Sequence, residues 1–546
     1  MQYGNPEHQK PRIHPLLPSI LLAGAFVALL CIFFNPRWET NDDVAMSMVA
    51  HGYGIADYGS SRLVFSNVLW GFIVRGLPPV GGWLGYSIAT LLSLTLAAAA
   101  TLYFLLRAGA GYVVALLVLV MIFARPVLFP QFTITAGLLT ASAVLGVYAF
   151  GRGGSLLELI AACCLGFLAY LIRAPEFALV FGVGLLLLPW PTLVRSRTAW
   201  WAALGLALCI AGATAIDIWA YSGPEWQEFW QLNLARAPFT DFGAVNRVLQ
   251  HPDVMQRLGF SENDIQLIGN FFFVDRRLSD PESLKTLLGE TPAQLATKAS
   301  FTSGYKSVPA IFGPRLVPLA LASFFLVVLS ARLNRILAWV MCLLIIFALG
   351  AAGRPDTPRV YIPLFSLLIT FCCAKGYLQS RWRYALTICI LLAGGLLNTG
   401  YLSEEAAESD ALLKQAGPGK FISPQSTVVW GADLPYQYIF PVFVQKTDLH
   451  DTRIYGLGVL TLAPFSVPTA DERAGNGMLA RLRSEDGIPL IADGHDQALL
   501  NTYCIEHYGS PLRLTPRTKT ELWTVMNASC TPAEKRGDLR AGSDRG

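Results

Sequence analysis

Long apolar runs separated by short charged turns fill most of the first 400 residues. The longest runs match the roughly 20 apolar residues that a helix needs to cross a bilayer core. They predict about eleven membrane-spanning helices, at 17–34, 83–106, 112–130, 136–150, 156–172, 177–194, 199–219, 315–330, 336–352, 361–374 and 384–400. The pattern therefore predicts an all-α polytopic membrane protein whose transmembrane domain comprises residues 1–400.

The more polar segments predict what lies between and after these helices. Residues 35–82 form a first external loop with two stretches too short to cross the bilayer, which we expect to be helices at the membrane interface. A large external loop, 222–313, contains several helical patterns. Short β-rich runs and a helical stretch in 401–530 predict a small external α/β domain. The charged tail, 531–546, has the composition of a disordered segment.

Charges in the turns predict the orientation of the helices. The turns after alternate spans carry Arg107, Arg152 and Arg195 and no acid, whereas the segment after the first span carries Glu39 and Asp57. Because cytoplasmic loops are rich in Lys and Arg, we expect the N-terminus in the cytoplasm and the C-terminal domain outside. The first run is followed by many others and lacks a small-residue cleavage site, so it is not a cleaved signal. These features predict an integral protein of a bacterial inner membrane, with a periplasmic C-terminal domain.

Composition and cysteine usage exclude several classes of protein. Only 14% of the residues are charged, against about a quarter in soluble domains. The net charge of +4 gives no indication of nucleic-acid binding, and the chain has no nucleotide-binding fingerprint. Eight of the ten cysteines lie in apolar runs. Cys504 and Cys530 lie in the polar C-terminal region, and they could form one disulfide in an oxidising compartment.

Two adjacent carboxylates, Asp42 and Asp43, follow the first predicted span, and arginines gather on the same predicted side of the membrane. A charge near bilayer depth is costly, so it is retained where it lines a cavity or meets a partner. A salt bridge, for example between Arg173 and Glu176, is the alternative for any single arginine. Together the charges indicate a site for an anionic headgroup, which arginine binds with a planar fork. The external arginines are Arg62, Arg75, Arg125, Arg173, Arg354 and Arg359.

The order of these features resembles the GT-C glycosyltransferases, which are polytopic enzymes that use polyprenyl-phosphate sugars. They include protein O-mannosyltransferases and the lipid A aminoarabinose transferase. Members have an acidic pair after the first span, as in Asn-Asp-Asp at 41–43, and a basic residue before the second interfacial helix, as at Arg62. Leu-Ile-Arg-Ala-Pro at 171–175 is similar to their Thr-Lys-Gly element, and Arg359-Val-Tyr361-Ile-Pro is similar to a late Arg-Tyr motif. The departures are an Asp-Asp pair in place of Asp-Glu and arginine in place of lysine.

The resemblance implies an inverting transfer of a sugar from a polyprenyl-phosphate donor. Asp42 or Asp43 would accept the proton of the acceptor hydroxyl, and Asp42 is preferred because members commonly place the base first in the pair. Arg62, Arg173 and Arg359 would hold the donor phosphate. No cofactor is required, and the chemistry allows a divalent metal without needing one.

Three further residues are candidates for contact with the substrate: Glu176, Tyr221 and Tyr361. Tyr221 could stack on a sugar ring together with Trp226 and Trp230, although we expect both tryptophans to belong to the interfacial aromatic belt. The expected partners are the lipid-linked sugar donor, membrane lipid, and an acceptor that is a glycolipid, polysaccharide or protein of the cell envelope.

The sequence pattern also allows two other functions. An O-antigen polymerase or ligase is also external and lipid-linked, but it usually carries its arginines in large late loops. A transporter or flippase of lipid-linked glycans would need polar residues along the bilayer midplane, whereas the middle of nearly every span here is apolar.

Overall fold

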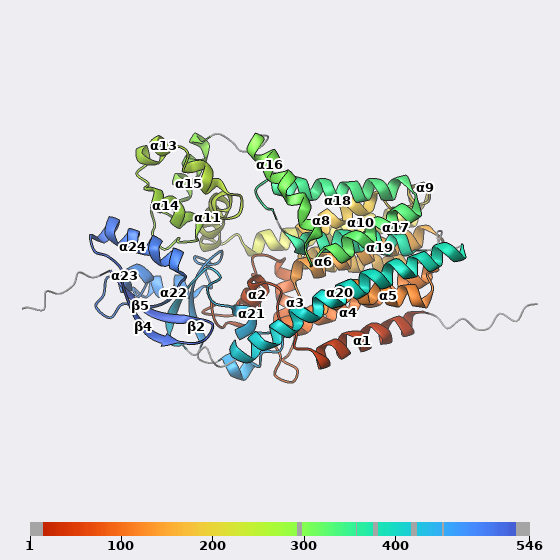
Figure 1. Cartoon of the computed structure of the whole chain (residues 1–546), viewed down its shortest axis with the longest axis horizontal. Coiled ribbons are helices and arrows are strands. Elements are labelled where there is room, and N and C mark those ends of the chain that lie inside the picture. Colours follow the sequence, from red (N-terminus) through yellow and green to blue (C-terminus); the bar gives the residue numbers. More distant parts are fainter. Residues whose placement is uncertain are drawn as a thin grey trace, which may run out of the picture.

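The computed structural model describes residues 15–291, 297–355, 357–374, 380–416, 423–449 and 452–530. The predicted tail 531–546 lies outside these ranges. One half of the molecule is a bundle of apolar helices, and the other is formed by a five-stranded sheet and the helices around it (Figure 1). The helices of the bundle are α1 (Leu16–Phe33), α4 (Gly85–Arg107), α5 (Tyr112–Leu128), α6 (Phe132–Gly151), α7 (Leu156–Ile172), α8 (Ala174–Leu185), α9 (Trp190–Leu193), α10 (Arg197–Ala220), α17 (Val317–Ser330), α18 (Leu333–Ala351), α19 (Pro358–Cys373) and α20 (Arg381–Ala416).

The chain is a multi-span membrane protein, as the apolar pattern predicts. Six of the described helices, α1, α4, α6, α10, α18 and α20, are long and apolar enough to cross a membrane. A seventh crossing is added if the segment Lys298–Phe312 and α17, which meet at 90°, count as one broken span. Four shorter apolar helices are α5, α7, α8 and α19. Each of the eleven predicted runs overlaps one of these helices, although only six reach spanning length unaided.

The predicted span 177–194 differs most from the structure. It is divided into α8 and the short helix α9, which begins directly after Pro189. Proline has no backbone N–H and collides with the preceding turn of a helix, so a continuous apolar run does not become one helix here.

Helix α6 is the centre of the bundle, where it packs against α4, α7, α8 and α19. Its glycines allow this close packing. A Cβ at Gly146 would come within 2.8 Å of Ala162 Cβ, and one at Gly137 would overlap the ring of Pro363. In contrast, α1 exposes Leu17, Ile32 and other apolar side chains along the outside of the bundle.

Helices α2 (Asn41–His51) and α3 (Val68–Gly76) occupy the first loop. The sequence predicts both as surface helices, but most of α2 is buried, including Val44, Met46 and Met48. The C-terminal half covers it, with backbone bridges between Gly54 and Arg453 and between Ala56 and Ser466. A short amphipathic pattern cannot reveal that a distant part of the chain will cover its polar face.

The sheet of the C-terminal half is mixed, with strand order β2-β1-β3-β5-β4. The first three strands in this order are parallel, and the β3–β5 and β5–β4 pairs are antiparallel. This is the mixed α/β unit that the β-rich runs predict. Its elements are β1 (Ser423–Trp430), α21 (Tyr436–Ile439), η2 (Lys446–Leu449), β2 (Thr452–Leu457), α22 (Val467–Arg473), α23 (Met478–Leu482), β3 (Ile488–Ile491), α24 (Gly494–Tyr508), β4 (Arg513–Lys519) and β5 (Thr524–Ser529).

The large loop after α10 shares a hydrophobic core with this sheet. Phe272 stacks on Trp430 with ring centroids 5.2 Å apart, and the indole Nε1 of Trp430 donates to the carbonyl oxygen of Asn270 at 2.6 Å. The loop and the sheet therefore bury apolar surface against each other. The loop contains α11 (Pro224–Asp241), α12 (Ala244–Val248), α13 (Pro252–Arg257), α14 (Glu262–Gly269), α15 (Pro281–Glu290), α16 (Lys298–Ser307) and η1 (Val308–Phe312).

Cys504 and Cys530 form a disulfide, with Cα atoms 5.6 Å apart, which confirms the pairing that their isolation in the sequence suggested. The bond joins α24 to the end of β5. The cross-link restricts the unfolded chain between the two cysteines and so stabilises this half of the molecule.

Candidate functional site

Asp42 and Arg359 meet although 317 residues separate them in the sequence. Arg359 Nη1 donates to Asp42 Oδ2 at 2.8 Å, and each side chain is about one-third exposed. Asp42 lies in the first turn of α2, and Arg359 lies in the first turn of α19 directly after Pro358, where proline is favoured in a helix. Of the predicted carboxylates and arginines, these two make a direct ion pair that remains accessible to solvent.

Asp43 lies inside the protein and has a different environment. Its Oδ1 accepts hydrogen bonds from Tyr86 OH and from the backbone N–H of Phe132, both at 3.0 Å, and Thr40 Oγ1 donates to Oδ2 at 3.2 Å. Burial, together with the charge of Asp42, raises the pKa of Asp43 well above its usual value. Because Phe132 is the first residue of α6, Asp43 holds α2 against the start of the central helix.

Arg173 and Glu176 lie near this pair, at the break between α7 and α8. Arg173 Nη1 donates to the carbonyl oxygen of Phe65 at 3.0 Å, and its guanidinium group lies 5.3 Å from the ring centroid of Phe132. The charges of Arg359, Asp42 and Glu176 all act on Arg173. Among the described residues Arg173 and Glu176 do not form the suggested salt bridge. Instead, Glu176 is buried, and its Oε1 has no hydrogen-bond partner in the described part of the chain.

Arg62 lies elsewhere, at the end of α10. Its Nε donates to the carbonyl oxygen of Ala220 at 2.7 Å, and its guanidinium group lies 5.8 Å from the ring centroid of Trp226. In the described residues it makes no hydrogen bond or ion pair with Asp42 or Arg359.

The three candidate substrate residues are all buried. Tyr221 OH accepts a hydrogen bond from the backbone N–H of Val64 at 3.0 Å, and its ring packs edge-on against Trp226. Tyr361 is completely buried within α19. Trp226 is also buried and packs against Phe465 of the C-terminal half, so it does not face lipid as the aromatic-belt interpretation expects. Neither tyrosine presents an open ring face to a sugar in this conformation.

A cavity of about 250 Å³ adjoins Asp42 between α2 and the C-terminal sheet. The sheet contributes the loops at the carboxyl ends of β1 and β2, the edge at which open α/β sheets bind ligands. This wall was not predicted from the sequence, where the glycines that follow two buried β-rich runs were the available signal. The lining residues are Asn41, Asp42, Ala45, Met48, Ile55, Phe65, Phe271, Gly431, Ala432, Tyr436, Gly456, Leu457, Gly458, Val459, Leu460, Thr461, Ser466 and Pro468.

Arg125 takes part in a buried ion network. It pairs with Glu39 at 2.9 Å and with Glu405 at 2.7 Å. Arg315 reaches the same two carboxylates, both at 3.2 Å, and Arg37 reaches Glu405 at 3.4 Å. The network joins four parts of the chain: α5, α20, the segment that precedes α2 and the segment that precedes α17. For Arg125 the structure therefore confirms the alternative interpretation, in which the arginine forms a salt bridge.

The other two arginines that the sequence places outside, Arg75 and Arg354, also have protein neighbours. Arg354 pairs with Asp241 at 3.1 Å. Burial, with the charges of Arg75 and Lys446, lowers the pKa of His51 to about 4, so His51 is neutral at pH 7. Its Nε2 accepts a hydrogen bond from the backbone N–H of Tyr86 at 3.2 Å.

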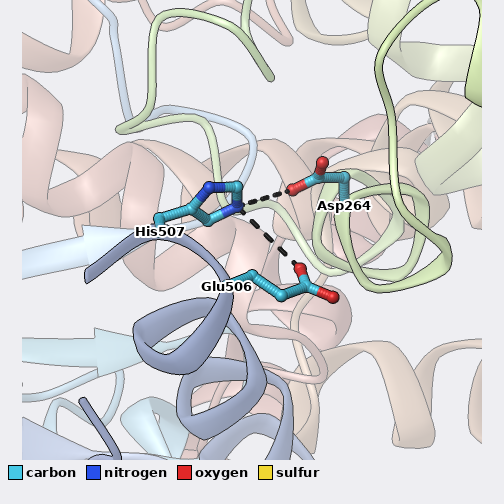
Figure 2. A group of neighbouring side chains, drawn as sticks. All are labelled: Asp264, Glu506 and His507. Atoms are coloured by element: carbon cyan, nitrogen blue, oxygen red, sulfur yellow. Dashed lines mark hydrogen bonds and ion pairs between the residues drawn. The ribbon is translucent and has the colours of Figure 1, made fainter. Parts of the chain in front are cut away.

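A group of ionisable side chains joins the large loop to the sheet (Figure 2). His507 Nε2 lies 3.2 Å from Asp264 Oδ1 and 3.9 Å from Glu506 Oε2, and Figure 2 shows the three converging from α24 and α14. Arg277 Nη2 lies 3.3 Å from His507 Nε2 and 3.6 Å from Asp264 Oδ1. Because the chain itself supplies this cation, the group holds the two segments together without a metal ion.

The fold and the site define a polytopic α-helical membrane protein. Its α/β half forms one wall of a cavity beside a solvent-accessible Asp–Arg pair. Neither a family model nor a curated protein matches the sequence. Two crystal structures are similar to the chain, both of ArnT from Cupriavidus metallidurans, one bound to undecaprenyl phosphate and one in the apo state.

The ArnT structure bound to undecaprenyl phosphate has a TM-score of 0.36 and 14% sequence identity, with 94% of this chain and 97% of that chain covered. The apo structure has a TM-score of 0.37 and 15% identity, with 94% and 98% covered. The likeness extends over nearly the whole length of both chains.

Proposed function

We propose that the protein is a membrane glycosyltransferase that moves a sugar from a polyprenyl-phosphate donor to an acceptor of the cell envelope on the outer face of the membrane. The pair formed by Asp42 and Arg359 carries this proposal, because it combines a carboxylate and a phosphate-binding group beside a cavity. Arg173 and Arg354 add positive charge to the same region, since the charges of Arg359, Asp42 and Arg354 all act on Arg173.

The donor phosphate and Asp42 compete for Arg359 in this mechanism. When the phosphate binds, the guanidinium group of Arg359 turns from the carboxylate to the phosphate oxygens, which it can hold with two parallel hydrogen bonds. Asp42 then no longer pairs with Arg359, and its carboxylate is free to accept a hydrogen bond from the acceptor hydroxyl. Binding of the donor thereby prepares the group that activates the acceptor.

Transfer is a single displacement with inversion at the sugar C1. Asp42 accepts the proton of the acceptor hydroxyl while that oxygen forms a bond to C1. The bond between C1 and the phosphate oxygen breaks, and its electron pair leaves with the phosphate, whose growing charge Arg359 and Arg173 stabilise. Asp43 takes no part in the chemistry, because its carboxylate is buried and already accepts three hydrogen bonds.

The proposal is tested by mass spectrometry of envelope glycolipids and glycans from cells with and without the gene. Cells without it should lack one sugar modification, and the wild-type gene should restore it. Arg359→Ala should lower the modification by roughly 10- to 100-fold, the value of a charged hydrogen bond, and Arg359→Lys should recover part of it. The exposed Arg473 pairs with Glu225 at the surface, so Arg473→Ala is the matched control and should behave as wild type. An unchanged envelope in cells lacking the gene would contradict the proposal.

The orientation of the chain is tested separately with a reporter that is active only outside the cytoplasm. A fusion after Leu402 should be active and one after Arg197 silent, because the turn at Arg197 carries only cations. The reverse result would put the Asp42 site on the cytoplasmic face, where the proposed use of a lipid-linked donor would fail.

A further inference from the structure

Three carboxylates gather at the carboxyl edge of the C-terminal sheet. Asp433 lies in the loop after β1, and Asp493 and Asp496 lie between β3 and the first turn of α24. One carboxylate oxygen from each lies within 4.8 Å of the others. Strand order β2-β1-β3 places β1 between two parallel neighbours, so the chain leaves the ends of β1 and β3 in opposite directions. The carboxylates thus lie at the switch point where α/β sheets bind ligands.

Backbone amides orient two of these side chains. The N–H of Asp493 donates to Asp433 Oδ2 at 2.6 Å, and the N–H of Asp496 donates to Asp493 Oδ1 at 2.8 Å. Each of these two carboxylates still has an oxygen available for a further partner. The two loops are therefore held in register before any ligand arrives.

Asp496 provides an independent reason to expect a ligand. Its side chain is only 8% exposed, and its Oδ1 has no hydrogen-bond partner among the described residues. A buried acceptor without a partner is costly in a folded protein, and the cost grows when it carries a charge. The described part of the chain therefore supplies neither a hydrogen-bond donor nor a cation for this oxygen, and a bound ligand could supply one.

The group around His507 shows how the same protein treats a comparable cluster. There Arg277 brings a guanidinium group to Asp264 and His507, two of the residues drawn in Figure 2. No Lys or Arg of the described chain lies within 4.0 Å of the carboxylate oxygens of Asp433, Asp493 or Asp496, so none forms an ion pair with them. Three carboxylates without an arginine or lysine partner suit a metal ion. The cluster around His507 already contains the guanidinium group of Arg277 and suits one less well.

We propose that Asp433, Asp493 and Asp496 bind a calcium ion. Hard divalent cations prefer carboxylate and carbonyl oxygens, and calcium takes them at about 2.3–2.6 Å. Oxygens on opposite sides of one calcium ion are about 4.6–5.2 Å apart, so three oxygens that all lie within 4.8 Å of one another can share one ion. Magnesium demands a near-ideal octahedron and usually keeps several of its waters, so a set of three carboxylates in loops suits calcium better.

The bound ion would stabilise a wall of the cavity beside Asp42. Gly431 and Ala432 line that cavity and directly precede Asp433. Tyr436, which also lines it, is near enough for the charge of Asp433 to act on its hydroxyl. Calcium binding would join this loop to the one after β3, so its effect on stability is independent of the proposed glycosyl transfer.

Calcium binding is tested on the full-length protein in detergent after treatment with EDTA. Equilibrium dialysis with radioactive calcium should give about one ion per chain at this site, and 1 mM-scale calcium should raise the thermal unfolding midpoint through preferential binding to the folded state. Magnesium at the same concentration should have a smaller effect. Absence of both calcium binding and a calcium-dependent shift in the wild type would overturn the proposal without any variant.

Two substitutions locate the ion. Asp496→Asn, which is nearly isosteric, should weaken calcium binding by roughly tenfold or more and should raise the unfolding midpoint of the calcium-free protein, because it removes a buried negative charge. Glu506→Gln is the matched control in the other cluster and should leave calcium binding unchanged. Calcium binding that is equal in wild type and Asp496→Asn, or that is lost in Glu506→Gln, would contradict the assignment.

Discussion

Asp42→Asn is expected to lower the rate of sugar transfer by roughly 10²- to 10⁴-fold, the usual contribution of a general base, while the protein still folds and binds the donor. Asparagine has nearly the same shape but cannot accept the proton of the acceptor hydroxyl. Loss of the charge also releases Arg359, so donor binding should not weaken. The measurement is single-turnover transfer by purified protein with saturating donor, together with a separate donor-binding titration.

Asp57→Asn is the control for this substitution. Asp57 lies in the same loop, is as exposed as Asp42 and also pairs with an arginine, Arg453. It has no role in the proposed chemistry, so its variant should transfer at the wild-type rate. If Asp42→Asn, folded and inserted, retains normal transfer, the proposed site is wrong.

Arg125→Met should destabilise the protein by about 3–5 kcal/mol, because removal of one partner leaves buried charges without compensation. Arg125 is 5% exposed, and its loss removes a direct partner from both Glu39 and Glu405. Far-ultraviolet circular dichroism during unfolding in mixed detergent micelles would measure the change in the free energy of unfolding.

Arg315→Met is the matched control, because Arg315 contacts the same two carboxylates with a side chain that is 48% exposed. An exposed ion pair contributes at most about 1 kcal/mol, so this variant should be nearly as stable as wild type. Equal and small losses in the two variants would show that the network contributes little to stability.

The sequence predicts the positions of the helices in the bundle because a helix that crosses a bilayer needs a run of about 20 apolar residues, which is easy to recognise. It fails at 177–194, where Pro189 divides the run, and at α2, whose polar face is covered by the C-terminal half. The disulfide was also predictable, since Cys504 and Cys530 are the two cysteines outside apolar runs. The core shared by the large loop and the sheet was not, because nothing local to Phe272 and Trp430 indicates that they stack.

The candidate site was predictable in its residue types more than in its geometry. Asp42 and Arg359 were both candidates, but a contact between residues 317 positions apart cannot be read from a single sequence. The role of Arg62 at the donor phosphate stays a prediction, and its hydrogen bond to the carbonyl oxygen of Ala220 could not be read from its position before α3. Short motifs identify which residues are present at a membrane face, whereas the packing of the helices determines which of them meet.

Helix α20 limits how the cavity beside Asp42 can open. It comprises 36 residues, or about 54 Å at 1.5 Å per residue, which exceeds the roughly 30 Å of a bilayer core. It therefore continues without a break from the bundle toward the sheet (Figure 1), and Glu405 and Ser409 in its C-terminal half bind Arg125 and Arg37. A hinge at the membrane surface would have to break both the helix and this network. Substrate entry is therefore expected to depend on movement of the short loops after β1 and β2, with the two halves of the molecule remaining a fixed frame.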